Sequence, residues 1–308
     1  MLLEIVLLAV GIGLLVKGSD LLVDAAEKLA LAAGVPVLVV GFTLVAAGTS
    51  VPELVVDTGA ALSGVGELAV GDIVGSNIVD ICLVLGIAAL FRPVVVNPVV
   101  MKLEIPAAIA ISLLFMLVAF DGTIGRIDGM ILIAAALAYF YLILHRLKKA
   151  RQPKAERKFA GLTDVALLVA GLVAIIIGGR LTLDAAVNIA TAAGISPYLV
   201  GLLVVAIGTS LPELATSANA SRKGSGDLVL GNCLGSFSFN ALVVIGLCAL
   251  ITPLPVPGLL DPIIMTAAAI LLVPLIMRGG HMLDRREGLL LIAVYLAYAG
   301  YKITTAGI

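Results

Sequence analysis

Two segments of the chain place oxygen-bearing side chains inside long apolar runs. GTSVPELVVD spans residues 48–57, and the similar GTSLPELATS spans residues 208–217. In the first segment, Thr49 and Ser50 precede Glu53 by four and three positions, so a helix would present all three side chains on one face. The second segment repeats this set. Each segment therefore offers two hydroxyls and a carboxylate together.

A proline follows the hydroxyls in both segments. Because proline has no N–H, Pro52 is expected to break its helix and to leave the carbonyl of Gly48 without a helical partner. Pro212 and Gly208 stand in the same relation. The small residues Ala46 and Gly48 would let another helix approach closely. The sequence thus predicts broken helices that present carbonyl, hydroxyl and carboxylate oxygens.

The segments GDIVGSNIVD and GNCLGSFSFN add polar side chains one helical turn apart. Ser76 precedes Asp80 by four positions, and Ser236 precedes Asn240 by four. Together the motifs supply three carboxylic acids, one amide and six hydroxyls, which are hard donors suited to Na⁺ and Ca²⁺. The candidate side chains are Thr49, Ser50, Glu53, Ser76, Asp80, Thr209, Ser210, Glu213, Ser236 and Asn240.

A purely structural role is the alternative to a cation site. A G-T-S-P sequence in a membrane helix is commonly just a kink whose hydroxyls bond to the backbone. A carboxylate at the bilayer centre, however, costs about 2.5–3.5 kcal/mol even on a lenient insertion scale. Acids at matching positions of two apolar segments would be costly without a function. We therefore interpret these residues as a cation site.

The composition predicts a polytopic membrane protein. Of the 308 residues, 61% are hydrophobic and 13% are charged, whereas a soluble domain carries about 25% charged residues. The formal net charge is −1, and no basic patch with interleaved aromatics indicates nucleic acid binding. No hydrolase or nucleotide-binding motif is present, so we expect neither an enzyme nor a cofactor.

The N-terminal run and the cysteines have simple interpretations. The run carries Glu4 where a signal peptide would carry a positive region, so we interpret it as the first transmembrane helix. Cys82, Cys233 and Cys248 lie in apolar runs without metal-ligand spacing. We expect them to be small, buried packing residues.

Charges, glycines and prolines divide the apolar sequence into ten expected spans, because a helix needs roughly 20 apolar residues to cross a bilayer. These spans lie near residues 2–17, 36–62, 68–91, 104–120, 128–146, 161–179, 197–221, 228–251, 261–278 and 287–304. The expected fold class is an all-α polytopic membrane protein with ten transmembrane helices.

The two halves align without a gap at an offset of 160 residues, which indicates duplication. Because five spans per half is an odd number, the second half must enter the membrane upside down. This is the inverted-repeat plan of many secondary transporters. Residues 1–144 would form the first five-helix repeat, 145–160 a cytoplasmic linker, and 161–308 the second, inverted repeat.

Lysine and arginine predict the orientation. The connector HRLKKARQPKAERK holds seven of the 19 such residues, so we expect it in the cytoplasm. Sixteen then lie on the cytoplasmic side, leaving Arg126, Arg180 and Lys302 outside. Both termini are thus predicted to be extracellular, in an integral, multi-pass protein of the cell membrane. Since tryptophan is absent, tyrosines such as Tyr139 and Tyr298 are expected as interfacial anchors.

The paired motifs, GTSVPE with GDIVGSNIVD and GTSLPE with GNCLGSFSFN, resemble the two alpha repeats of the Na⁺/Ca²⁺ exchanger branch of the Ca²⁺/cation antiporters. The resemblance covers nearly the whole chain in order and spacing. The proton-coupled branch typically carries a GNxxE-type motif instead. The resemblance implies ten helices with four ion sites at mid-membrane, between the second, third, seventh and eighth helices. It also implies that the first and sixth helices slide across the remaining bundle.

The resemblance further implies a role for each candidate residue. Glu53 and Glu213 would bridge the sites and bind Ca²⁺, with oxygens from Thr49 and Thr209. Na⁺ and Ca²⁺ would exclude each other because they share the glutamates. The outer and inner Na⁺ sites would be completed by Ser50, Ser76, Ser210, Ser236 and the carbonyls of Ala46 and Ala206.

One departure from the family pattern concerns the middle site, which Asp80 and Asn240 would complete. In the archaeal exchanger pattern, the Asn comes from the first repeat and the Asp from the second. Here the two are exchanged, which keeps the total charge. In addition, the connector of 14 residues (145–158) is too short for a regulatory Ca²⁺-binding domain.

We therefore expect a Na⁺/Ca²⁺ antiporter that uses Na⁺ entry to expel Ca²⁺. It would need the lipid bilayer but no obligate protein partner. A cation/H⁺ exchanger on the same scaffold is the alternative, because carboxylates in a low-dielectric site also bind protons. An ion channel is a further alternative, although an inverted repeat with shared sites favours a transporter.

Two more aspartates make the halves unequal. Asp57 and Asp72 correspond to Ser217 and Asn232 of the second half. In the predicted topology both aspartates lie on the outer side of the glutamates, whereas Ser217 and Asn232 lie on the inner side. We expect either that neighbouring groups satisfy the aspartates locally, or that they form an acidic outer vestibule that concentrates cations.

Overall fold

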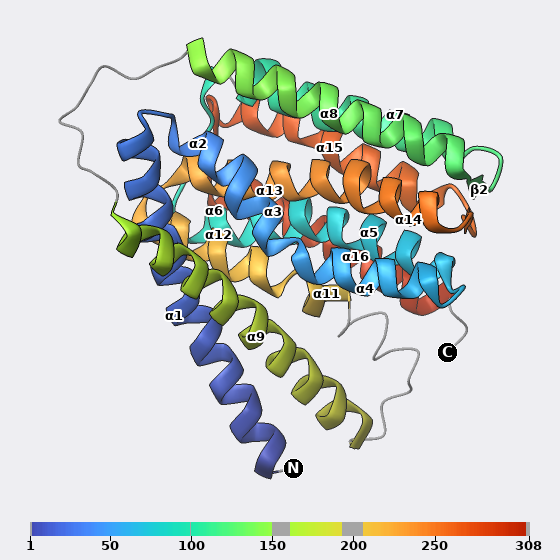
Figure 1. The fold of residues 1–308 in the computed structure, drawn as a ribbon, viewed down its shortest axis with the longest axis horizontal. Coiled ribbons are helices and arrows are strands. Elements are labelled where there is room, and N and C mark those ends of the chain that lie inside the picture. The colour runs from blue at the N-terminus through green and yellow to red at the C-terminus, as the bar shows by residue number, and fades with distance from the viewer. Residues whose placement is uncertain (1, 99, 150–160, 193–205, 306–308) are drawn as a thin grey trace.

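The computed structural model describes residues 2–98, 100–149, 161–192 and 206–305. These residues are almost entirely helical (Figure 1). Among them, eight helices are long and apolar enough to cross a membrane, and the bent pair Val37–Thr49 and Val51–Leu62 makes a ninth if it crosses as one span. The helical, multi-pass class is confirmed. The expected span 197–221 lies partly outside the described residues.

The elements of the first half, with π-helical turns marked η, are α1 (Leu2–Ala33), α2 (Val37–Val40), η1 (Gly41–Val45), α3 (Ala46–Thr49), α4 (Val51–Leu62), α5 (Gly66–Val79), η2 (Asp80–Val84), α6 (Leu85–Phe91), β1 (Val94–Val95), η3 (Val100–Glu104), α7 (Ile105–Val118), β2 (Thr123–Ile124) and α8 (Arg126–Lys149).

The elements of the second half are α9 (Leu162–Ala192), α11 (Ala206–Thr209), α12 (Leu211–Lys223), α13 (Gly226–Phe239), η5 (Asn240–Val244), α14 (Ile245–Ile251), β3 (Leu254–Pro255), α15 (Leu260–Arg278), β4 (Met282–Leu283) and α16 (Arg285–Thr305). The bounds of α13, η5 and α14 each lie 160 residues after those of α5, η2 and α6. Element boundaries thus follow the periodicity of the sequence.

The first and sixth helices are longer than predicted. α1 continues to Ala33 instead of ending near residue 17, and α9 continues to Ala192 instead of residue 179. Charges end the apolar run but not the helix, because Leu, Ala, Glu and Lys are all good helix formers. α1 ends before Gly34, whose φ of 65° suits a residue without a Cβ.

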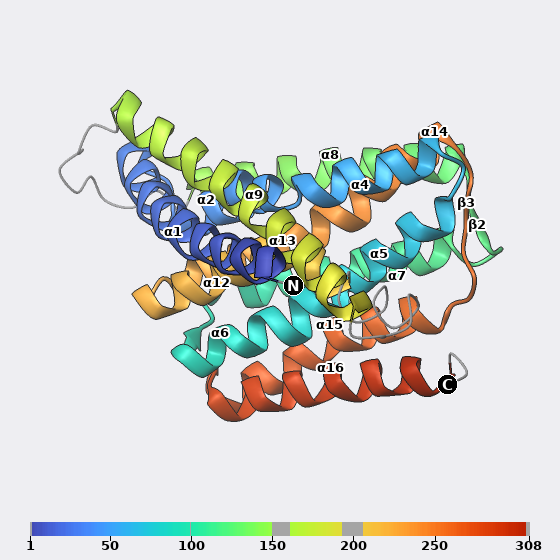
Figure 2. The ribbon, with the colours of Figure 1, turned by 90° about the horizontal axis from the view of Figure 1, so that it is seen from below.

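α1 and α9 lie side by side in two perpendicular views (Figures 1 and 2). Glycines bring the two backbones together. A Cβ on Gly18 would lie 2.8 Å from the carbonyl oxygen of Gly171, and a Cβ on Gly178 would lie 2.8 Å from that of Gly11. These four glycines are two pairs related by the 160-residue offset. The crossing therefore depends on the absence of side chains at equivalent positions of both helices.

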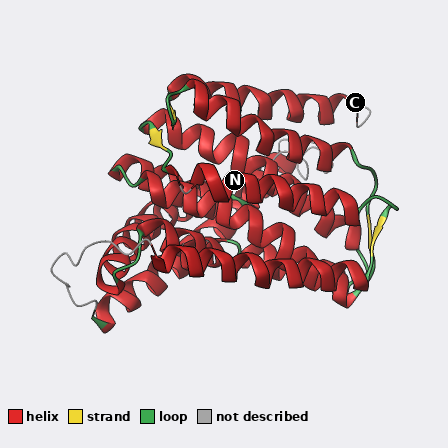
Figure 3. Cartoon of the chain, turned by 90° about the horizontal axis from the view of Figure 1, so that it is seen from above, coloured by secondary structure: helices red, strands yellow, loops and turns green. Residues whose placement is uncertain are grey.

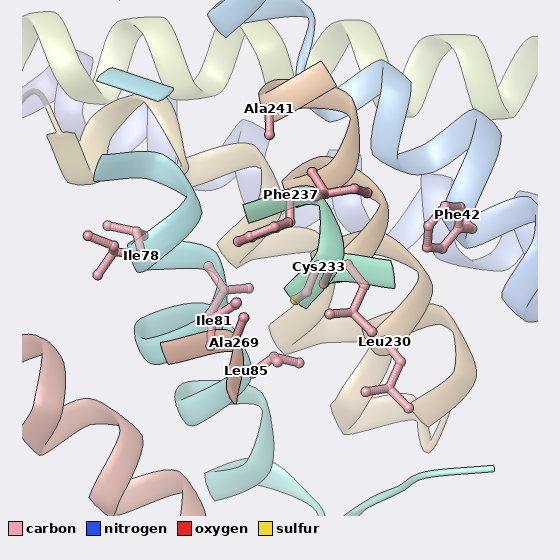
Figure 4. Packing of buried hydrophobic residues seen from close by; sticks show 14 of the residues in the cluster. Phe42, Ile78, Ile81, Leu85, Leu230, Cys233, Phe237, Ala241 and Ala269 are labelled. Carbon is pink, nitrogen blue, oxygen red and sulfur yellow. The ribbon is translucent and has the colours of Figure 1, made fainter. Parts of the chain in front are cut away.

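The core lies where α5, η2 and α6 pack against α13 and η5. Figure 4 shows this region, with Ile78, Ile81 and Leu85 on one side and Cys233 and Phe237 on the other. All three cysteines of the chain are buried and free. Their expected packing role is therefore confirmed.

Two small antiparallel sheets lie at opposite ends of the molecule (Figure 3). Val94 of β1 pairs with Leu283 of β4, and Thr123 of β2 pairs with Pro255 of β3. Each sheet joins a loop of the first half to a loop of the second half. The loops at each end of the helices are thereby tied together across the two halves.

Tyr139 is not the interfacial anchor that the sequence suggested. Its side chain is buried, and its hydroxyl donates to Glu104 Oε2 at 2.9 Å. Ser238 Oγ lies 3.3 Å from the same hydroxyl, and the ring packs edge-on against Phe42. The polar end of this tyrosine finds partners inside the bundle, so it does not need the membrane surface.

Candidate cation site

The two GTSxPE segments break at equivalent serines. Ser50 has φ −83° and ψ 10°, and Ser210 has φ −84° and ψ 8°, so neither continues the helix before it. Helices α4 and α12 begin at the next residue, and Pro52 and Pro212 occupy their second positions, where a missing N–H is tolerated. The two parts of the first segment are bent by 43°. The predicted breaks are confirmed.

The first break places Thr49 against α13 of the other half. Thr49 Oγ1 lies 3.1 Å from Asn232 Oδ1 and 3.5 Å from Ser236 Oγ. Ser236 Oγ also lies 3.5 Å from the carbonyl oxygen of Ala46. The side chains of Thr49, Asn232 and Ser236 have no exposed surface. Three predicted ligands, Thr49, Ser236 and the carbonyl of Ala46, thus share one buried cluster with Asn232.

The second break makes the equivalent contacts with α5. Thr209 Oγ1 lies 3.4 Å from Ser76 Oγ and donates to Asp72 Oδ1 at 3.3 Å. Each of these three residues lies 160 positions from one in the first cluster. The two GTSxPE segments therefore face each other's following helix, as an approximately symmetric pair.

Glu53 and Glu213 are both buried but differ in their hydrogen bonds. Glu213 Oε1 accepts from Ser50 Oγ at 3.3 Å and from Ser236 Oγ at 3.4 Å. Among the described residues, neither oxygen of Glu53 has a hydrogen-bond partner, and neither does Glu213 Oε2. Glu53 lies within electrostatic range of Glu213 and Asp80. Carboxylates this close repel one another when ionised, so a cation between them would be stabilising.

Asp80 and Asn240 begin the π-helical turns η2 and η5. Each side chain is about 1% exposed, and within the described chain none of their side-chain oxygen or nitrogen atoms has a hydrogen-bond partner. Asp80 also interacts electrostatically with Glu213. π-helical turns occur frequently at functional sites. No signal in the sequence predicted these turns.

Two predicted ligands make fewer contacts. Ser210 Oγ is buried and has no hydrogen-bond partner in the part of the chain that the structure describes. Ala206 is the first residue of α11, directly after residues that are not described. The role of its carbonyl stays a prediction.

Asn232 and Asp72 lie in the site although neither was predicted as a ligand. Asn232 Nδ2 donates to the backbone carbonyl of Glu213 at 3.3 Å, which ties α13 to α12. Each residue lies four positions before a predicted ligand, Ser236 or Ser76. That spacing is the signal that could have found them, because residues four apart share a helical face.

The site combines few acids with many neutral oxygens. In the described ranges, no three His, Cys, Asp or Glu side chains gather closely enough to hold one metal ion. An ion bound here would therefore complete its shell with hydroxyl and carbonyl oxygens, which suit hard cations such as Na⁺ and Ca²⁺. Buried polar atoms are normally hydrogen-bonded, so the unpartnered oxygens of Glu53 and Asp80 are available to such an ion.

A cavity of about 340 Å³ between α4, α9, α11 and α12 reaches Thr209. Its lining is mainly aliphatic and includes Val51, Val55 and Leu183, with Arg180 as a charged group. Thr209 is thus the point at which this cavity meets the polar cluster.

The chain matches a family model described as sodium/calcium exchanger protein over residues 3–145 and 163–304. It is 40% identical over 274 residues to the inner membrane protein YrbG of Escherichia coli (strain K12), which covers 85% of this chain and 83% of that protein. It is 29% identical over 338 residues to the sodium/calcium exchanger MaX1 of Methanosarcina acetivorans, which covers 95% of this chain and 96% of that protein.

The fold is similar to that of a solved structure of the sodium-calcium exchanger NCX_Mj soaked with 10 mM Na⁺ and 10 mM Sr²⁺. The TM-score is 0.86 at 28% sequence identity, and the alignment covers 96% of this chain and 97% of that one. The similarity therefore extends over both halves and includes the elements that carry the buried oxygen cluster.

Proposed function

Because the chain belongs to the sodium/calcium exchanger family, we propose that this cation antiporter expels Ca²⁺ in exchange for Na⁺. The observation that carries the proposal is the buried meeting of the two GTSxPE segments, where Glu213 accepts hydrogen bonds from hydroxyls of both halves and Glu53 lies within electrostatic range of Glu213. Ionised carboxylates that are buried need counter-cations, and the neutral oxygens around them suit both ions. The relative MaX1 is itself called a sodium/calcium exchanger.

Each proposed ligand would bind Ca²⁺, Na⁺ or both. Glu53 and Glu213 would hold Ca²⁺ with oxygens from Thr49 and Thr209, while the same glutamates take part in the Na⁺ sites. Na⁺ and Ca²⁺ would then compete for one set of charges, so the protein carries one or the other. The remaining proposed ligands are Ser50, Ser76, Ser210, Ser236, the carbonyls of Ala46 and Ala206, and Asp80 with Asn240 at the middle site.

We propose ten spans in two inverted five-helix repeats, with both termini outside the cell. Contacts between distant segments support this division of the loops between two faces. The ion pair of Lys28 with Asp164 joins two segments predicted to be cytoplasmic, and that of Lys302 with Asp261 joins two predicted to be external. The β1–β4 and β2–β3 sheets likewise join loops predicted to lie on the same face.

Alternating access would result from movement of α1 and α9 as one body. Their glycine-mediated contact supports joint movement, because the two backbones touch directly. α1 also packs against α12, and α9 packs against α11, so the pair lies across the second broken segment. Sliding this pair past the broken helices would expose the cation site to one face at a time.

Ca²⁺ uptake into proteoliposomes tests the proposal. An outward Na⁺ gradient at a fixed, equal pH on both sides should drive saturable Ca²⁺ accumulation. Accumulation that follows a pH gradient and ignores Na⁺ would identify the H⁺-coupled alternative. Ca²⁺ entry that needs no counter-ion and does not saturate would instead identify a channel.

A further inference from the structure

The two halves differ at one corner of the site. In the second half, Asn232 Nδ2 donates to Ser217 Oγ at 3.0 Å, while Asn232 Oδ1 lies 3.1 Å from the hydroxyl of Thr49. Ser217 and Asn232 have no exposed surface. Thr49, Asn232 and Ser217 are therefore linked by two consecutive hydrogen bonds between neutral groups.

Asp57 and Asp72 occupy the equivalent positions of the first half. Thr209 donates to Asp72 Oδ1 at 3.3 Å, just as Thr49 bonds to Asn232. The hydrogen bonds end there: across the described residues, Asp72 Oδ2 and both oxygens of Asp57 have no hydrogen-bond partner. Asp57 is 0% exposed, and Asp72 Oδ2 is buried although the residue as a whole is partly exposed.

The second half indicates how these two aspartates face each other. Its Ser217–Asn232 hydrogen bond requires that side chains at the two positions point toward one another. In the first half, Asp57 and Asp72 interact electrostatically, as this arrangement predicts. Two carboxylates thus lie within electrostatic range of each other where the other half has a neutral hydrogen bond. Because Asp57 is fully buried, it does not line the acidic outer vestibule that was one of the two expectations from the sequence. Local hydrogen bonding, the other expectation, is not seen at Asp57 among the described residues either.

We propose that Asp57 and Asp72 bind one additional Ca²⁺ ion beside the central cluster. Two carboxylates balance the charge of a divalent cation, and carboxylate oxygens are its preferred ligands. The Thr209 hydroxyl contacts both Asp72 and Ser76, and Thr209 also lines the cavity, so this residue connects the proposed position to the central site and to a route of access. The second half offers no equivalent, so the site exists on one face only.

The proposed Ca²⁺ site is an addition to the exchange function, and its existence does not depend on Na⁺ being the coupling ion. Its test is the number of Ca²⁺ ions bound per chain, measured by equilibrium dialysis with radioactive Ca²⁺ on the purified protein in Na⁺-free buffer. The Asp57→Ser, Asp72→Asn double variant copies the pair that the second half already contains. We expect wild type to bind one Ca²⁺ more per chain than this variant. The control Asp121→Asn, which neutralises an exposed aspartate outside the cluster, should leave the number unchanged.

A second variant separates this site from the central one. Glu53→Gln combined with Glu213→Gln removes the proposed central Ca²⁺ ligands, and it should retain one bound Ca²⁺. Adding Asp57→Ser and Asp72→Asn should abolish that remaining binding. The proposal would be overturned if wild type and the Asp57→Ser, Asp72→Asn variant bound the same number of Ca²⁺ ions per chain. If the Asp57→Ser, Asp72→Asn variant does not fold, the Glu53→Gln, Glu213→Gln variant provides the test. The proposal is then overturned if this glutamate variant binds no Ca²⁺.

Discussion

At the scale of single residues, Glu53 and Glu213 differ in how the protein satisfies them. Glu213 accepts two hydroxyl hydrogen bonds, whereas Glu53 has no hydrogen-bond partner among the described residues. Glu53→Gln and Glu213→Gln each remove one charge at nearly constant size. Either change should lower the rate of Na⁺-driven Ca²⁺ uptake by at least about tenfold, because an interaction with a charged group is worth about 1.5–3 kcal/mol.

Glu67→Gln is a matched control for these variants, because Glu67 is an exposed glutamate in the first turn of α5. It should transport Ca²⁺ like wild type in the same vesicle assay. Wild-type uptake by the Glu53 or Glu213 variant, at equal amounts of reconstituted protein, would contradict the assignment of the glutamates.

Residue type and spacing predicted which side chains would meet, but not how they pair. Thr49 and Ser236 come from motifs 187 positions apart and lie in contact, as the duplicated pattern suggested. The sequence could not predict that Ser50 bonds to Glu213 while Ser210 has no partner in the described chain. Equivalent residues carry the same chemistry, so such asymmetry depends on small displacements between helices that no local pattern specifies.

At the scale of elements, the crossing of α1 and α9 is a contact that is sensitive to added volume. Gly18→Ala would place a Cβ 2.8 Å from the backbone oxygen of Gly171, which cannot rotate away. The two helices must separate, at a cost of about 1–3 kcal/mol for overpacking. We expect a lower Tm in detergent and slower Ca²⁺ uptake.

Gly13→Ala makes the same chemical change on α1 where nothing lies within 4 Å of the added Cβ. Alanine favours a helix over glycine by up to about 1 kcal/mol, so this variant should be as stable as wild type or more stable. Equal Tm values for the Gly13 and Gly18 variants would show that the close crossing does not contribute to stability.

The element boundaries show where sequence reasoning succeeds and where it fails. The breaks at Ser50 and Ser210 were predictable, because proline removes a specific backbone hydrogen bond. The length of α1 was not predictable from the apolar run. The end of such a run marks where the chain leaves the hydrocarbon of the membrane, and a helix can continue beyond that point. The π-helical turns at Asp80 and Asn240 were also missed, since they arise from the packing of helices and not from local propensity.

At the scale of the whole molecule, the proposed orientation predicts which loops face the outside of the cell. Thr123 is exposed in β2, at the end predicted to be external, whereas Lys28 is exposed at the predicted cytoplasmic end of α1. The native cysteines are buried and should react slowly. In intact cells, a membrane-impermeant maleimide should label Thr123→Cys but label Lys28→Cys only after permeabilisation. The reverse pattern would invert the topology.

The charge of the central site predicts that exchange responds to voltage. Glu53, Glu213 and Asp80 carry three negative charges when ionised, so Ca²⁺ leaves one uncompensated whereas several Na⁺ ions can neutralise all three. One net charge moved across the membrane is worth about 2.3 kcal/mol per 100 mV. A clamped potential, positive inside and set with K⁺ and valinomycin, should therefore change the rate of Na⁺-driven Ca²⁺ uptake.

A variant at Asp80 tests whether the third negative charge causes this response to voltage. Asp80→Asn leaves two carboxylates, which Ca²⁺ neutralises fully, so the voltage dependence of uptake should weaken. Combining Asp80→Asn with Asn240→Asp returns the third carboxylate on the equivalent π-helical turn of the second half, because Asp80 and Asn240 each begin their turn. That pair of changes should restore the voltage dependence. If uptake in wild type is indifferent to the clamped potential, the central site does not cycle between states of different charge.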